Sequence, residues 1–264
     1  ALQAEPQSRR ARPDTQAATA PAATQAAEVP PTTTPTQPAG LDPNAVGLLR
    51  ETAVQVLMLK PDYAEALRRT EQYLKLDPNN LALVSFRASC LTELGKAKQA
   101  LDDLRRVQQL RPLEPGPMNN LGYQYAELGI ELTKAEELIR QAVTVRPETA
   151  FIDSLGWVLY KQGRLGQAAA AFEEILRQQR DDDAKPLPAI IFDHAGDAFW
   201  RLGWNDKAVT LWKRSLEVAK DEKPVNHEVT QVQAHTPGKI EAVEAGRQPD
   251  VAPLGEGVKE PDTD

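Results

Sequence analysis

The sequence predicts an all-α protein built from about five copies of a helix-turn-helix unit, because small residues recur at a fixed period. Four alanine or glycine positions are each followed seven residues later by a glycine: Ala88, Gly122, Gly156 and Gly196, then Gly95, Gly129, Gly163 and Gly203. An in-phase series of alanines follows at Ala100, Ala135, Ala168 and Ala208, with Ala66 one period earlier. Within each glycine series the spacings are 34, 34 and 40 residues, which indicates a stacked helical array.

The fourth unit shows how one copy is expected to fold. Apolar residues recur at helical spacing up to Gly163, and a second amphipathic helix begins near Leu165. We expect Gly163 to end the first helix in the left-handed conformation. Gly156 and Ala168 are small where two helices have to approach closely, and Phe172 fills the space beside them.

The other units follow the same pattern with local departures. The first is the poorest match, with Pro61 where the turn glycine belongs. Ala53 in the first unit and Arg87 in the second stand where the third and fourth units have Leu121 and Leu155. The turn near Ile130–Thr133 holds one extra residue, and about six extra residues precede Ala189. The expected solenoid covers residues 41–222, with units near 47–80, 81–114, 115–148, 149–188 and 189–222.

Both flanks differ from this core in composition. Residues 1–40 hold seven prolines among Ala, Thr and Gln, which predicts a disordered linker. From Asp221 onward the chain carries ten acidic and four basic residues, so 223–264 is expected to be an acidic tail that is disordered like the linker. Within it, Thr236-Pro237 and Gly246 predict a short helix over 237–246 that caps the end of the solenoid.

The charge balance and the single cysteine limit the function classes. A net charge of −7 argues against nucleic-acid binding, which needs a basic surface. No apolar stretch is long enough for a transmembrane segment, and Cys90 alone excludes an internal disulfide. The start at Ala1 suggests a mature or trimmed form. The linker resembles spacers of exported bacterial proteins, which favours the periplasm or envelope and leaves the cytoplasm open.

The unit itself resembles the tetratricopeptide repeat. The resemblance rests on Leu155-Gly156, Ala168, Phe172 and Ile175, on prolines 78, 112 and 147 that close three units, and on their recurrence over residues 44–220. It implies a right-handed α-solenoid whose first helices line a concave groove. Residues 120–123 and 153–160 further resemble repeats of bacterial secreted or lipid-anchored tetratricopeptide proteins.

Transferred by phase, the family's groove positions give a candidate binding site. We expect it to hold a protein or peptide with basic and apolar side chains, on an aromatic floor with acidic spots; Trp157 and Trp200 could instead serve packing between units. The family's carboxylate clamp is not expected, because only Asn120 fits it. The predicted partner-binding residues are Asn119, Asn120, Tyr123, Asp153, Trp157, Tyr160, Asp193, Asp197 and Trp200.

The sequence favours a non-catalytic interaction module with no cofactor and no metal. It carries no metalloprotease, CxxC, nucleophile-elbow or phosphate-loop motif. Asp193 and Asp197 share a helix face from which His194 points about 100° away. Two alternatives stay open: a scaffold of the cell envelope that self-associates or is tethered, and an interaction domain of a longer, enzymatic chain. The oligomeric state is left open.

Overall fold

A computed structural model describes residues 42–59, 62–181, 186–223 and 226–258. They belong to one compact unit, Asp42–Asp264. The linker predicted over 1–40 lies outside the described residues. All the regular elements in the described ranges are α-helices, as the sequence predicts. Among them, none combines the length and the apolar character that crossing a bilayer requires.

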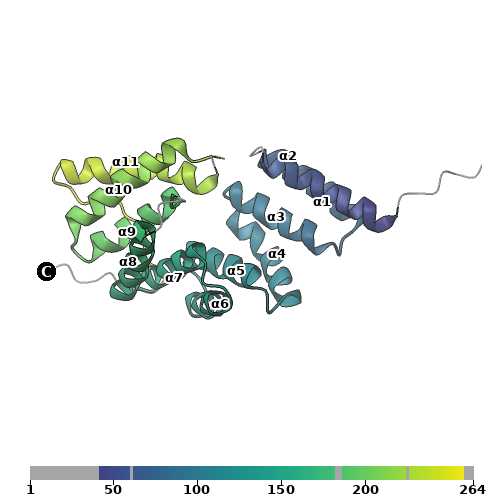
Figure 1. Ribbon diagram of the computed structural model, residues 1–264, viewed down its shortest axis with the longest axis horizontal. Helices are drawn as coiled ribbons and strands as arrows, with labels where there is room; N and C mark the ends of the chain where they lie inside the picture. Colours follow the sequence, from purple (N-terminus) through teal and green to yellow (C-terminus); the bar gives the residue numbers. More distant parts are fainter. Residues whose placement is uncertain (1–41, 60–61, 182–185, 224–225, 259–264) are drawn as a thin grey trace, which may run out of the picture. The chain divides into compact units, whose positions relative to one another are not determined.

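Ten of the helices form five consecutive pairs, and an eleventh follows them (Figure 1). Each helix packs on the one before it, so neighbouring units share a continuous core. The pairs are α1 (Pro43–Leu59) with α2 (Tyr63–Leu76), α3 (Leu81–Glu93) with α4 (Ala97–Leu110), α5 (Pro115–Glu127) with α6 (Leu132–Val145), α7 (Thr149–Lys161) with α8 (Leu165–Asp181), and α9 (Ala189–Arg201) with α10 (Asn205–Asp221). The eleventh helix, α11, spans His227–Glu244.

The repeated glycines do what their spacing predicts. Four turns carry a glycine in the left-handed region, with φ between +68° and +77°, at Gly95, Gly129, Gly163 and Gly203. In the third unit α6 begins three residues after the glycine instead of two, and the extra residue, Glu131, also has a positive φ of 48°.

The earlier glycine of each pair provides room for a large side chain of the following helix. A Cβ on Gly156 would lie 2.8 Å from the Phe172 ring, and one on Gly196 would lie 2.5 Å from Cδ1 of Trp212. Phe172 and Trp212 are fully buried. Small residues thus set the distance between the two helices of a unit, as predicted.

Arg87 keeps its unit packed although it stands where the third and fourth units have a leucine. Its guanidinium donates two hydrogen bonds of 2.6 Å to the carboxylate of Asp103 on α4. Asp103 is buried, so the arginine and the aspartate compensate each other at this helix contact.

The prediction of a disordered C-terminal flank is wrong for residues 226–258, which pack on the solenoid. The helix there is longer than the sequence predicts, and the predicted start at Pro237 is wrong. α11 begins ten residues earlier, where Asn226 accepts a hydrogen bond from the backbone N–H of Val229. Pro237 lies inside the helix and removes one backbone donor. Contacts on both sides of the proline, at Val232 and Ile240, hold the helix against its neighbours and outweigh this cost.

Candidate functional site

The predicted groove residues lie on α5, α7 and α9, and the C-terminal part of the chain covers most of them. We call the inner face the surface of α3, α5, α7 and α9 that contacts α11 and residues 250–258; α11 contacts both α3 and α9. Tyr123 and Trp200 are partly buried, and Asn120 is exposed. The remaining predicted residues are buried: Asn119, Asp153, Trp157, Tyr160, Asp193 and Asp197. The chain's own residues therefore occupy the face expected to receive a partner.

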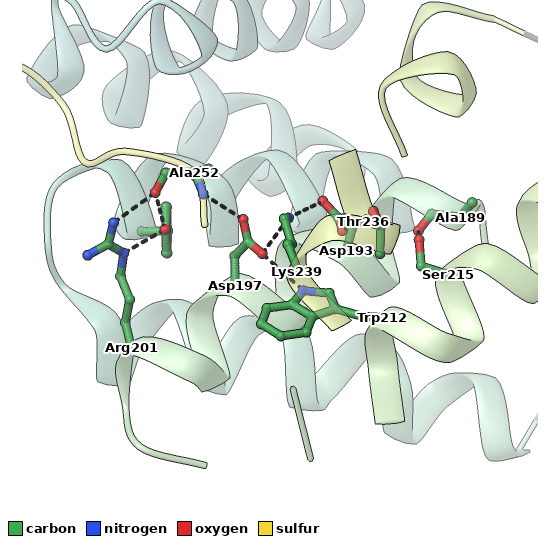
Figure 2. Close-up of polar contacts among 10 residues, drawn as sticks. Ala189, Asp193, Asp197, Arg201, Trp212, Ser215, Thr236, Lys239 and Ala252 are labelled. Carbon is green, nitrogen blue, oxygen red and sulfur yellow. Dashed lines mark hydrogen bonds and ion pairs between the residues drawn. The ribbon is translucent and has the colours of Figure 1, made fainter. Parts of the chain in front are cut away.

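Two acidic residues of α9 hold a lysine of α11 (Figure 2). The Nζ atom of Lys239 lies 2.9 Å from Oδ2 of Asp193 and 2.6 Å from Oδ1 of Asp197. Although burial disfavours the ammonium ion, the two carboxylates raise the pKa of Lys239. The lysine therefore stays charged in this buried position.

Further hydrogen bonds satisfy the carboxylate oxygens of Asp193 and Asp197. Thr236 donates to Oδ1 of Asp193 at 2.7 Å, and the indole of Trp212 donates to Oδ1 of Asp197 at 3.0 Å. The remaining oxygen, Oδ2 of Asp197, accepts from the backbone N–H of Ala252 at 2.9 Å. Each of the four carboxylate oxygens thus accepts a hydrogen bond, as buried charge requires. We call these residues the Lys239 cluster.

Residue 252 is held by its backbone (Figure 2). Its N–H donates to Asp197, and its carbonyl oxygen accepts from the Tyr160 hydroxyl and, at 2.9 Å, from Nη2 of Arg201. Nε of Arg201 also donates to the Tyr160 hydroxyl at 2.7 Å, which orients both groups. The Asp197 carboxylate thus accepts from the N–H of residue 252, and Tyr160 and Arg201 donate to its carbonyl oxygen. Both polar groups of this residue's backbone are satisfied by side chains.

The following residues are held in the same way. The Pro253 carbonyl accepts from Nζ of Lys161 at 3.1 Å, and the Gly255 N–H donates to the carbonyl of Lys161 at 2.8 Å. The N–H of Glu256 donates to the carbonyl of Gly129 at 3.2 Å. Gly255 is buried, and a Cβ there would collide with Leu132 and lie 3.0 Å from the Lys161 carbonyl oxygen. Residues 252–256 are therefore bound mainly through their backbone, and a side chain at position 255 would have to displace Leu132 and press on the Lys161 carbonyl.

Trp157 and Tyr160 pack between units instead of forming an open floor. The Trp157 ring stacks on Tyr160, with centroids 4.9 Å apart, and on His194 of the next unit, at 3.9 Å. Its indole N–H donates to Glu127 of the preceding unit at 2.5 Å. Trp200 lies 5.8 Å from Trp212 of α10 by ring centroids. The packing between units that the sequence left open is thus present for Trp157, whereas Trp200 packs against a helix of its own unit.

His194 faces Asp153, away from the Lys239 cluster. Its Nδ1 lies 3.1 Å from Oδ1 of Asp153, and both side chains are buried. Although burial disfavours the imidazolium ion, the Asp153 carboxylate raises the pKa of His194. In the part of the chain that the structure describes, no three His, Cys, Asp or Glu side chains are grouped as metal ligands would be.

The first turn of α11 brings a further carboxyl group to the inner face. Burial raises the pKa of Glu228 to about 7, and the nearby carboxylates of Asp153 and Glu127 add to the shift, while His194 and the Tyr123 hydroxyl oppose it. One residue earlier, the backbone N–H of His227 donates to Glu93 of the second unit at 2.9 Å. α11 therefore bridges from the second unit to the fifth.

Some polar space remains on the inner face beneath α11. A cavity of about 360 Å³ lies between α7, α9, α11 and residues 250–253, with Lys161, Gln231 and His235 among its lining residues. Separately, Oδ1 of Asn119 is buried without a hydrogen-bond partner, unlike every other buried side-chain polar atom of the described residues.

Several residues that build this site were missed from the sequence. Thr236, Lys239 and Ala252 come from the tail, and Lys161 and Arg201 end two of the first helices. Lys239 is the residue that could have indicated the site. It lies three residues after Thr236 and next to Ile240, and a lysine that is buried there needs acidic residues facing it.

Comparison with known proteins agrees with this architecture. The sequence model described as "Tetratricopeptide repeat" matches residues 60–115 and 131–184. "TPR repeat-containing protein PA4667" of Pseudomonas aeruginosa is 30% identical over 142 residues, which is 50% of this chain and 24% of that protein. The chain therefore spans about a quarter of the length of that relative.

Two solved structures share the fold. A tetratricopeptide repeat protein from Parabacteroides merdae has a TM-score of 0.58 at 18% identity, over 75% of this chain and 72% of its own. A thermophilic TPR protein from Thermus thermophilus has a TM-score of 0.54 at 18% identity, over 71% and 97%. With the five helix pairs described above, these matches show that the chain contains tetratricopeptide repeats and shares the fold of such repeat proteins.

Proposed function

We propose that this chain is a non-catalytic interaction module whose inner face, in units three to five, binds an extended segment of a partner protein. One observation carries the proposal: side chains of α7 and α9 already hold a protein segment by both polar groups of its backbone at Ala252. Such contacts do not depend on the side chain of the bound residue, so a segment from another protein can make them as well.

The charge of the inner face supports a partner with a basic side chain. Asp193 and Asp197 hold the ammonium group of Lys239 where the two carboxylates converge. A partner that displaces α11 leaves these carboxylates to be matched again, and a lysine or arginine is the group that does so.

Photo-crosslinking in an extract of the source organism tests this proposal. A photoreactive phenylalanine analogue replaces Trp200 on α9 in the full chain or, as the matched control, Trp204 in the following turn, which is 40% exposed. We expect a protein crosslinked from position 200 and not from 204, and a higher yield when Lys239→Met loosens α11. Crosslinking from 204 alone, or a yield that falls with Lys239→Met, contradicts binding at the inner face.

A second function, self-association through the first unit, is favoured by a different observation. The α1 side chains Leu48, Leu49, Val56 and Leu59 are 45–72% exposed. Leu49 and Val56 also line a hollow of about 510 Å³ between α1 and α2. An apolar face at one end of a solenoid is suited to packing against a second copy. Light scattering should show a mass that rises with concentration in the wild type and stays monomeric in Leu49→Lys/Val56→Lys; a monomer in both removes this alternative.

A further inference from the structure

We propose that residues 250–256 are an internal copy of the ligand, and that the inner face accepts a partner segment of the same type: a small residue, proline, an apolar residue and glycine, in that order. This inference rests on the proposed function and names the kind of peptide that it involves. In this chain the four positions are Ala252, Pro253, Leu254 and Gly255.

The backbone contacts fix where such a segment lies. Five backbone groups of residues 252–256 bond to α7, α9 and the turn after α5: the N–H and carbonyl of Ala252, the carbonyl of Pro253, and the N–H groups of Gly255 and Glu256. A helix cannot present these groups to the inner face, because its own N–H and carbonyl groups bond to each other.

The side chains then restrict the sequence. Glycine is favoured at position 255, because a Cβ there would meet Leu132 and lie 3.0 Å from the Lys161 carbonyl oxygen. Leu254 approaches the turn at Gly163, where its Cδ1 would lie 3.8 Å from a Cβ added to that glycine. Pro253 has no N–H to satisfy and holds the preceding Ala252 in the extended conformation. Its own ring is exposed, so proline acts here through the backbone.

The segment is attached more weakly than the helix before it. Pro249 and Gly255 are buried and Val251, Ala252 and Leu254 pack against the core only partly buried, whereas α11 buries Val229, Val232 and Ile240. The exposed residues 244–248, with Gly246 at a φ of +67°, separate the two. Few buried apolar contacts mean a low free energy of local opening. Residues 250–256 can therefore leave the inner face while α11 stays bound.

A labelled synthetic peptide of residues 248–258 tests the inference by fluorescence anisotropy with the full chain. In the wild type the tethered segment competes at a high effective concentration, so the peptide binds weakly. Gly255→Val removes that competition, because the valine cannot be accommodated, and we expect the peptide to bind at least tenfold more tightly. The matched control is Glu256→Val, which adds the same side chain one residue later at an exposed position and should behave as the wild type.

Three further measurements make the result decisive. A peptide that itself carries valine in place of glycine 255 should bind none of the chains. Adding Tyr160→Phe to Gly255→Val should weaken binding several-fold, because the Ala252 carbonyl loses a donor. If circular dichroism shows that Gly255→Val does not fold, Pro253→Ala changes an exposed ring and should give a smaller, several-fold gain.

The outcomes separate this inference from the function on which it rests. Equal binding of the glycine and valine peptides, or no binding of either to a folded variant, overturns the proposed ligand sequence. If crosslinking from position 200 still succeeds in that case, the inner face binds a partner of another sequence, and the proposed function stands. If crosslinking fails as well, both are wrong.

Discussion

Replacing Lys239 with methionine should release the C-terminal segment from the inner face. The substitution keeps most of the volume but leaves Asp193 and Asp197 buried without their cation. Breaking a buried ion pair in this way costs about 3–5 kcal/mol. The chain can avoid this cost by undocking α11, which returns both carboxylates to water. The destabilisation by Lys239→Met therefore cannot exceed the free energy with which residues 226–258 dock on the inner face. It should appear as local opening of these residues.

Hydrogen exchange measured by mass spectrometry separates local opening from global unfolding. At about 1.4 kcal/mol per tenfold change, a loss of about 3–5 kcal/mol should make exchange of the α11 amides roughly a hundred to a few thousand times faster. Amides of α1 and α2, which lie outside the bridge that α11 makes, should keep their rates. The matched control is Lys213→Met, which removes an exposed bridge from α10 to Glu244 of α11, with side chains 57% and 61% exposed. It should change the exchange by less than about fivefold. Equal effects of the two substitutions refute the idea that the Lys239 cluster holds the segment.

Three other predictions follow from the packing and the pKa shifts. Gly196→Ala should lower the free energy of unfolding in urea by about 1–3 kcal/mol, because the new Cβ meets the Trp212 indole. The control Gly166→Ala on α8 has open space around its Cβ and should raise that free energy by up to about 1 kcal/mol. Equal effects of the two substitutions contradict the close approach of Gly196 and Trp212. The pKa of Glu228, raised to about 7, means that its contribution to stability is full below its ordinary value of 4.5 and is lost as the pH rises through about 7. Glu228→Gln should therefore flatten the fall in unfolding free energy between those pH values by up to about 3 kcal/mol, and an unchanged slope rejects this cause. Burial raises the pKa of the Cys90 thiol to about 11, so a thiol reagent at pH 8 should label it only in denaturant, and rapid labelling of the native chain contradicts its burial.

The repeat units were predictable because each depends on neighbours in the sequence. Gly163 ends a helix through its own backbone, and Gly156 and Phe172 lie only 16 residues apart, so spacing alone indicates both roles. The covering of the inner face depends instead on contacts across long separations. Asp193 and Lys239 are 46 residues apart, and no local pattern states that they meet.

The errors at the C-terminus have the same origin. A proline inside a helix removes a backbone hydrogen bond, so the local sequence favours a helix that starts at Pro237. Buried side chains on both sides of the proline outweigh that local preference, and Asn226 caps a helix that begins ten residues earlier. The sequence assigns the groove residues to the correct helices, but their exposure depends on whether the tail returns to cover them.

The bridge that α11 makes changes how this protein is expected to fold. In an ordinary repeat array each unit contacts only its neighbours, so folding can start anywhere and unfolding can proceed unit by unit from an end. Here the hydrogen bond from His227 to Glu93 joins residues 134 positions apart, while Lys239 holds the other part of the same helix to the fifth unit. Units three and four cannot open without breaking one of these two attachments. Contacts of α11 therefore link units that are far apart in the sequence. The middle units should unfold together and refold slowly, as proteins of high contact order do.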